Sequence, residues 1–210
     1  MRFSIFLLIL ALTCGFSNAG EYRIDLSPEG FKLFSKRGWG KKTIYENLID
    51  ENGMPAIKAT ALASATNIGI KIEDPDLIKK YSYLNFNIQV LQDFTKDPKQ
   101  KEKDGHDYVC RVLYGVGKKI GSKVISLAHS SWLPQGFEQR SPWSKGSFDV
   151  IVSNDNSGNP IQIKVNVLKL LEKHHESLGG KINFLALFTD SNNTKEKVQC
   201  IYRDIFFSDR

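Results

Sequence analysis

The chain has 210 residues, of which 41% are hydrophobic and 25% charged, and its 29 Lys and Arg outnumber its 23 Asp and Glu to give a net charge of +6. These proportions are ordinary for a globular protein and exclude a disordered or low-complexity chain. The length suits one domain with one hydrophobic core.

The first residues show the three parts of a secretory signal peptide. Arg2 supplies a positive charge, and Phe3–Phe16 is an apolar stretch shorter than the about 20 residues that a membrane span needs. Ser17–Ala19 then offers a small-residue cleavage site. We therefore predict that residues 1–19 are a signal peptide. The alternatives are an uncleaved anchor and a lipoprotein processed at Cys14.

Export determines which partners we expect. Residues 20–210 are predicted to form a single β-sandwich domain that is periplasmic or secreted. A basic chain in that compartment is not expected to meet nucleic acid, and anionic envelope polymers or lipid headgroups suit it better. We expect a membrane contact only through the signal peptide, before cleavage. The alternative for the positive charge is a solvated surface.

Alternating apolar and polar residues predict β-strands along most of the chain. The stretch Ser82–Leu91 alternates most clearly, with apolar residues on one face and amides on the other. The apolar residues are Leu84, Phe86, Ile88 and Val90, and the amides are Asn85, Asn87 and Gln89. Further strands are predicted within Gly53–Glu73, with a break near Ser64–Asn67, and at Asp107–Val116, Lys123–Trp132, Phe148–Asn154, Lys181–Asp190 and Val198–Phe207.

Beyond the signal peptide, helical spacing of apolar residues appears in Ile163–Gly180, where Gly179 and Gly180 mark the end. This predicts one short helix near residues 165–178. Two long polar stretches, Lys96–Asp107 and Trp132–Ser147, predict loops. Many short strands with a single helix favour an all-β fold, an antiparallel β-sandwich.

Several blocks of the sequence, in order, resemble a family of bacterial exported proteins called domain of unknown function 3047. They are "GMPAIKATALASATN", "YLNFNIQV", "KDGHDYVCRVLY", "SSWLPQGFEQRSPW", "FTDSNNT" and "YRDIFF". The resemblance runs from about Thr43 to Phe207. It implies a jelly-roll sandwich similar to carbohydrate-binding modules and galactose-binding-like domains, with no established activity.

The chain departs from the family pattern at four positions. Asn85 and Asn87 stand where the family usually has Arg, and His106 and Asn192 each stand where it has Asp. Each change alters the charge, so a charged ligand inferred for relatives does not carry over directly.

The leading hypothesis is a non-catalytic module that binds a glycan or another envelope ligand. It assumes that two strands share one sheet, so that the polar faces of both line one groove. The residues of this predicted polar face are Asn85, Asn87, Gln89, Asp107 and Arg111. Amide, carboxylate and guanidinium groups suit sugar hydroxyls, which need donors and acceptors at fixed positions. In the long loop, Trp132, Trp143 and Phe137 are candidates for stacking on sugar rings.

A simpler interpretation makes the polar face a solvated surface with an Asp107–Arg111 ion pair, and the tryptophans anchors for their loop. A second hypothesis is a polysaccharide lyase or hydrolase in which His129 works with Asp107 or Asp190 as an acid–base pair. A third is a protein-interaction domain that uses an exposed sheet or edge.

Two further features leave alternatives open. Asp190, Asn192 and Asp204 carry oxygens that calcium accepts, but the same residue types are common in turns, so we expect no cofactor and keep calcium as the minority alternative. Cys110 and Cys200 remain after signal-peptide removal. They either form a disulfide or pack as free thiols in the core.

Overall fold

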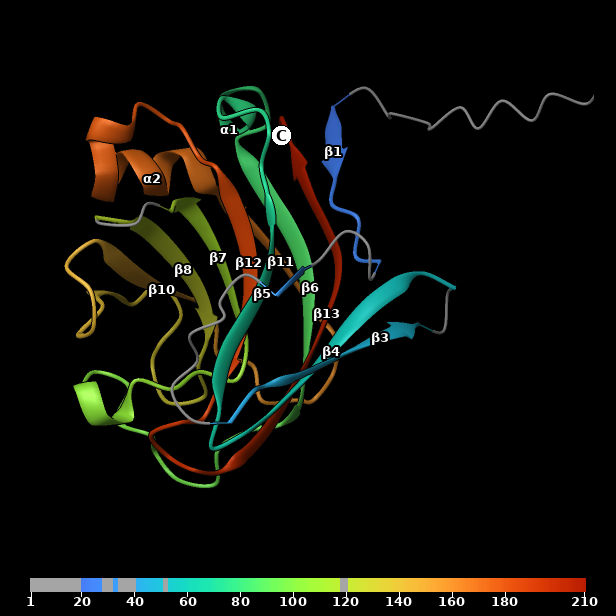
Figure 1. Cartoon of the computed structure of the whole chain (residues 1–210), viewed down its shortest axis with the longest axis vertical. Helices are drawn as coiled ribbons and strands as arrows, with labels where there is room; N and C mark the ends of the chain where they lie inside the picture. The colour runs from blue at the N-terminus through green and yellow to red at the C-terminus, as the bar shows by residue number, and fades with distance from the viewer. Residues whose placement is uncertain (1–19, 28–31, 34–40, 51–52, 118–120) are drawn as a thin grey trace, which may run out of the picture.

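The computed structural model shows two β-sheets packed face to face, with two short helices at one end (Figure 1). It describes residues 20–27, 32–33, 41–50, 53–117 and 121–210. The predicted signal peptide, residues 1–19, lies outside the described residues. This arrangement confirms the predicted jelly-roll type of β-sandwich.

In the described part of the chain, sheet A contains six strands. Five of them follow the order β11 (Ile161–Asn166), β6 (Tyr83–Gln92), β13 (Lys197–Ser208), β4 (Pro55–Leu62) and β3 (Ile44–Ile49). The sixth, β1 (Glu21–Arg23), pairs with the end of β13. Each described pairing in this sheet is antiparallel.

Sheet B contains seven strands among the residues that the structure describes. Their order is β2 (Lys32–Leu33), β5 (Ala65–Lys71), β12 (Phe184–Asp190), β7 (Arg111–Val116), β8 (Lys123–His129), β10 (Ser147–Ser153) and β9 (Glu138–Arg140). One pairing departs from the predicted antiparallel pattern, because β8 and β10 run parallel. Residues 130–146 cross back between these two strands, a connection long enough for a parallel pair.

The core lies between the sheets and follows the period-two pattern of the sequence. On β6, Leu84, Phe86 and Ile88 are buried among apolar residues of both sheets, which confirms the inward face predicted there. On β7, Val112 and Tyr114 point inward. Because neighbouring residues of a strand face opposite ways, Arg111 and Leu113 are on the outer face of sheet B.

The structure has two helices in its described residues, where the sequence predicted one. They are α1 (Leu77–Lys80) and α2 (Val167–His175), with 3₁₀ turns η1 (Lys103–Gly105) and η2 (Glu176–Leu178). The helix predicted near residues 165–178 is α2 followed by η2, and it begins two residues later because Val165 and Asn166 belong to β11, whereas α1 was not predicted. Asn166 ends that strand and caps α2, its side chain accepting a hydrogen bond from the Lys169 N–H at 2.9 Å.

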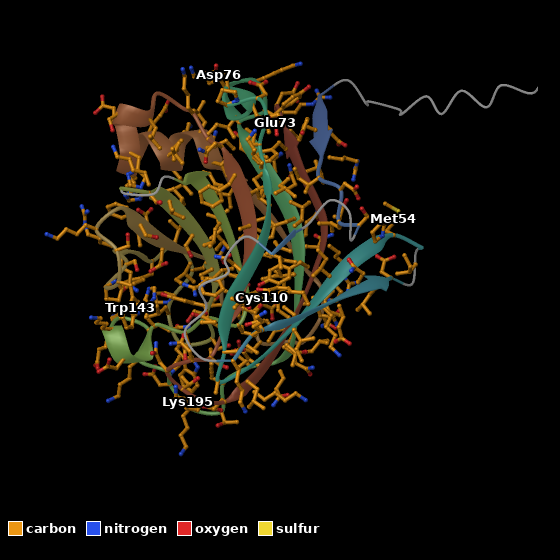
Figure 2. The ribbon with its side chains drawn as sticks, viewed as in Figure 1. Met54, Glu73, Asp76, Cys110, Trp143 and Lys195 are labelled. Atoms are coloured by element: carbon orange, nitrogen blue, oxygen red, sulfur yellow. A yellow bond between two sulfur atoms is a disulfide. The ribbon has the colours of Figure 1, made fainter. Side chains whose placement is uncertain are left out.

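A disulfide joins Cys110, just before β7, to Cys200 on β13. It therefore ties sheet B to sheet A, near the centre of the sandwich where Figure 2 labels Cys110. Of the two alternatives for these residues, the structure has the bonded one. In the described part of the chain, the helices are all too short or too polar to span a bilayer.

Candidate functional site

A cavity of about 610 Å³ lies over the outer face of sheet B. Its floor comes from alternate residues of neighbouring strands. One row across the sheet runs from Asn67 on β5 through Phe188 on β12 to Arg111 on β7. The next row includes Leu113 on β7, Ser126 on β8 and Asp149 on β10. The floor is therefore a mixture of apolar and polar side chains fixed by strand register.

Arg111 is the central charged group of this floor. Its Nη2 lies 2.6 Å from Asp190 Oδ2, and both side chains are 5% exposed. The guanidinium also lies over two rings, 4.2 Å from the Phe188 centroid and 5.0 Å from that of Tyr108. Asp190 Oδ1 accepts a hydrogen bond from the Tyr108 N–H at 2.9 Å. The ion pair and the two rings hold the guanidinium in place, and the Tyr108 N–H holds its partner Asp190.

A second buried pair lies in the same cavity. His106 Nε2 is 2.5 Å from Asp149 Oδ2, and both side chains are almost fully buried. The His106 ring packs edge-on against Tyr108, with 5.2 Å between centroids. Since an ionised carboxylate only accepts hydrogen bonds, Nε2 carries the proton when Asp149 is charged.

Three buried polar atoms of cavity-lining residues have no hydrogen-bond partner among the described residues. They are Asn67 Oδ1, Arg111 Nε and Ser126 Oγ. Buried polar groups in folded proteins are nearly always paired, because an unpaired one costs about 1–3 kcal/mol. Their position in one cavity gives a ligand, or a water that it holds, both donors and acceptors to satisfy.

Trp143 forms part of the cavity rim. It follows β9, is 55% exposed, and lies beside the η1 segment in Figure 2. Lys103 Nζ lies over the Trp143 ring, 4.5 Å from its centroid. The rim thus combines an exposed aromatic surface with a solvated cation, while the buried charges lie on the floor.

Burial raises the pKa of Asp190 to about 6, because loss of solvent outweighs the favourable effect of Arg111 and nearby Asp107 adds repulsion. The carboxylate is therefore ionised at neutral pH. Since its folded pKa lies above the unfolded value of 3.8, the folded state binds the proton first as the pH falls. The cost of burying this charge is present at pH 7 and is relieved between about pH 6 and pH 4.

We expect the Asp190 carboxyl carbon to titrate near pH 6 in an NMR experiment. We also expect this group to raise the free energy of unfolding on acidification. The rise is about 1.4 kcal/mol for each unit by which the folded pKa exceeds the unfolded pKa. Asp190→Asn is the matched variant, and its unfolding curves should lack that rise between pH 7 and pH 4. A titration midpoint below pH 4 would contradict the expectation.

The structure does not bring the predicted polar face together. Asn85, Asn87 and Gln89 lie on β6 in sheet A, whereas Arg111 lies on β7 in sheet B. The two outer faces are on opposite sides of the sandwich, so the assumption of a shared sheet was wrong. Alternation fixes which side chains share a face of one strand, but it does not say which strands are neighbours.

Two of the β6 amides, Asn85 and Gln89, bond to residues of β13 in sheet A. Asn85 donates to Ser208 Oγ at 2.8 Å, and Gln89 accepts from Arg203 at 2.7 Å. Of the predicted aromatic residues, Trp143 lines the cavity. Trp132 is 45% exposed and lies outside the cavity lining, while Phe137 packs in a small core with Leu133.

Asp107 is fully buried and holds the turn after β12. Its Oδ2 accepts hydrogen bonds from the Asn193 and Thr194 N–H groups at 2.9 and 2.7 Å. The ion pair of Arg111 is therefore with Asp190 and not with Asp107. The polar stretch "FTDSNNT" ends β12 and forms this turn before β13.

The proposed acid–base pairings of His129 are not formed. His129 is on the inner side of β8, with Ser153 Oγ 3.3 Å from its Nδ1 and Asp93 3.8 Å from its Nε2. Asp107 and Asp190 have the other partners described above. The sequence missed His106 and Asp149 as a pair, although Asp149 stands out as a charge within the apolar strand "SFDVIVS".

The three residues considered for calcium do not gather. Asp204 is at a bulge of β13 and pairs with Arg23 at 2.7 Å, whereas Asp190 pairs with Arg111. Asp204 lies seven residues along β13 from Lys197, roughly 20 Å away at about 3.3 Å per residue. Within the described ranges, no three His, Cys, Asp or Glu side chains are placed to hold a metal ion.

Residues 34–206 match the model of a family described as "Protein of unknown function (DUF3047)". The chain belongs to the DUF3047 family. This match confirms the resemblance seen in the sequence blocks, and it covers every residue of the cavity described above. No curated protein matches this DUF3047 chain in sequence.

Solved structures similar to this DUF3047 protein include binding modules and an enzyme. The family 11 carbohydrate-binding module from Clostridium thermocellum, in complex with a mixed-linked tetrasaccharide, is 12% identical, with 90% of this chain and 95% of that chain covered and a TM-score of 0.46. A family 30 module of a cellulosomal cellulase from the same organism is 10% identical, with 81% and 83% covered and a TM-score of 0.45. The xyloglucanase domain of a Sinorhizobium fredii effector is 10% identical, with 90% and 94% covered and a TM-score of 0.41. At TM-scores this low, function has to be inferred from the chain's own residues.

Proposed function

We propose that this DUF3047 protein is an exported, non-catalytic module that binds a glycan or another cell-envelope ligand in the cavity on sheet B. One observation carries the proposal. The cavity combines an exposed Trp143 at its rim with the unpaired polar atoms of Asn67, Arg111 and Ser126 on its floor.

The size and chemistry of the cavity suit a sugar. A volume of about 610 Å³ falls within the range of small-ligand sites, roughly 300–1,000 Å³. A sugar ring has an apolar face of C–H groups and a rim of hydroxyls. Phe188 and Leu113 offer apolar contact, while donors and acceptors fixed by strand register match hydroxyl groups, which both donate and accept.

The predicted signal peptide and the disulfide support the exported location. Disulfides persist in oxidising compartments and are rare in the cytosol. A Cys110–Cys200 bond that joins the two sheets is therefore consistent with a periplasmic or secreted protein. Mass spectrometry of the protein recovered from its native host tests this, since we expect the mature chain to begin near Gly20.

Trp143→Ala should weaken binding to a glycan identified on an oligosaccharide array. A buried Trp contact commonly contributes more than about 1 kcal/mol, so we expect a loss in affinity of about fivefold or more. Trp132→Ala is the matched control, because Trp132 is similarly exposed but lies outside the cavity. Calorimetry on both variants measures the difference. Equal losses, or a loss with Trp132→Ala alone, would contradict the assignment of the cavity.

A polysaccharide-acting enzyme is the second candidate. The observation that favours it is the buried His106–Asp149 pair in the cavity, since a histidine beside a carboxylate can accept and donate protons. Incubation with polysaccharides, followed by assays for new reducing ends and for unsaturated products, tests it. Turnover that is lost in His106→Ala but retained in His129→Ala would establish catalysis at this cavity and overturn the non-catalytic proposal.

A further inference from the structure

The charged groups that line the cavity are paired with one another. They are Arg111, Asp149 and Asp190, together with His106. The guanidinium of Arg111 is in contact with Asp190, and the imidazole of His106 is in contact with Asp149. With His106 neutral the lining has a net charge of −1, and with His106 protonated it is neutral. In neither state does the lining carry excess positive charge.

The buried carboxylates would oppose an anionic ligand. Asp149 and Asp190 are about as buried as the core, and the interaction between charges is strong where water is excluded. Asp107 lies close enough to Asp190 to repel its charge. A sugar carboxylate or sulfate on the floor would meet these groups and would also lose its own hydration. Neutral hydroxyl groups would not meet this repulsion.

The positive charge at the rim is exposed to solvent, unlike the buried charges of the floor. Lys103 is exposed beside Trp143, so water and salt screen its interaction with a ligand. Screening reduces an attraction at the mouth of the cavity more than a repulsion on its floor. The balance between them is therefore set by the buried groups, above all at moderate salt.

Within the glycan-binding function proposed above, on which this inference rests, we infer that the cavity selects uncharged sugars and rejects uronic-acid or sulfated sugars, with Asp149 as the specificity-determining residue. Asp190 is neutralised directly by a permanent cation, at 2.6 Å from Arg111. Among the described residues, the ion-pair partner of Asp149 is a histidine, which need not be charged. Asp149 therefore contributes the negative charge that an acidic ligand meets.

Matched pairs of oligosaccharides test this inference. Each pair consists of a neutral oligosaccharide and the same oligosaccharide oxidised at C6 to the uronic acid, arrayed together and followed by calorimetry on those that bind. At moderate salt we expect the neutral member to bind at least about tenfold more tightly. Asp149→Asn should reduce this ratio several-fold by improving binding of the acidic member, while its amide oxygen still accepts the hydrogen bond from His106.

Asp155→Asn is the matched control, because it removes the same charge from an exposed loop residue outside the cavity lining. It should leave the ratio unchanged. Acidic members that bind as tightly as neutral ones, or an unchanged ratio in Asp149→Asn confirmed as folded by circular dichroism, would overturn the inference and leave the glycan site standing. Failure of both members of every pair to bind would overturn the proposed function and the inference with it.

Discussion

Arg111→Ala is expected to lower the free energy of unfolding by about 3–5 kcal/mol and to abolish ligand binding. The substitution leaves Asp190 buried without its cation, and breaking a buried ion pair from one side costs about that much. It also removes the contacts of the guanidinium with the rings of Phe188 and Tyr108. Urea or guanidinium unfolding at pH 7 measures the loss.

The double variant Arg111→Met with Asp190→Leu separates the two effects. It removes both charges and fills the space with apolar atoms, so we expect most of the lost stability to return while binding stays absent. A folded, stable protein that no longer binds would assign the Arg111–Asp190 pair to the site itself. A loss in Arg111→Ala of less than about 1 kcal/mol would contradict the buried-pair argument.

Removal of the disulfide, by Cys110→Ala with Cys200→Ala, is expected to cost about 2–5 kcal/mol in the free energy of unfolding. The bond closes a loop with a sequence separation of 90 residues. Closing a long loop removes more entropy from the unfolded chain than closing a short one. It also joins the two sheets directly before Arg111. The loss is measured by denaturant unfolding of both proteins in non-reducing buffer.

Reducing agent supplies the control for this prediction. Wild-type protein treated with reductant should approach the stability of the double variant, whereas the double variant itself should not respond. Free thiols detected in untreated, folded protein from an oxidising host would contradict the disulfide. Equal stability of the wild type with and without reductant, once both thiols are shown to be free, would contradict its role in stability.

The fold class was predictable because strands bury one face and expose the other. That alternation is local, and it correctly gave the inward face of β6. It failed where a boundary depends on competition between neighbouring elements. Val165 and Asn166 were placed in the predicted helix but pair with β6 instead, because that pairing satisfies backbone groups at the edge of the sheet.

The candidate site was predictable only in part. Arg111, Asp190 and Trp143 were singled out from the sequence, but Arg111 and Asp190 were given partners that the structure does not show. The wrong grouping came from treating Asn87 and Arg111 as neighbours across one sheet. Which strands pair is decided by contacts between segments far apart in the chain, and a period of two carries no information about them.

The sequence by itself determined the all-β class, the alternating faces of its strands and membership of the DUF3047 family, because these depend on the order of residue types along the chain. Only the tertiary structure decided that Cys110 bonds to Cys200, that His106 meets Asp149, and that Asn67 and Ser126 face the same cavity as Arg111. The physical reason is that charge pairing and burial depend on distances in space. Those distances are set when the two sheets form and pack. The strands that meet there can be separated along the chain by most of the length of the domain.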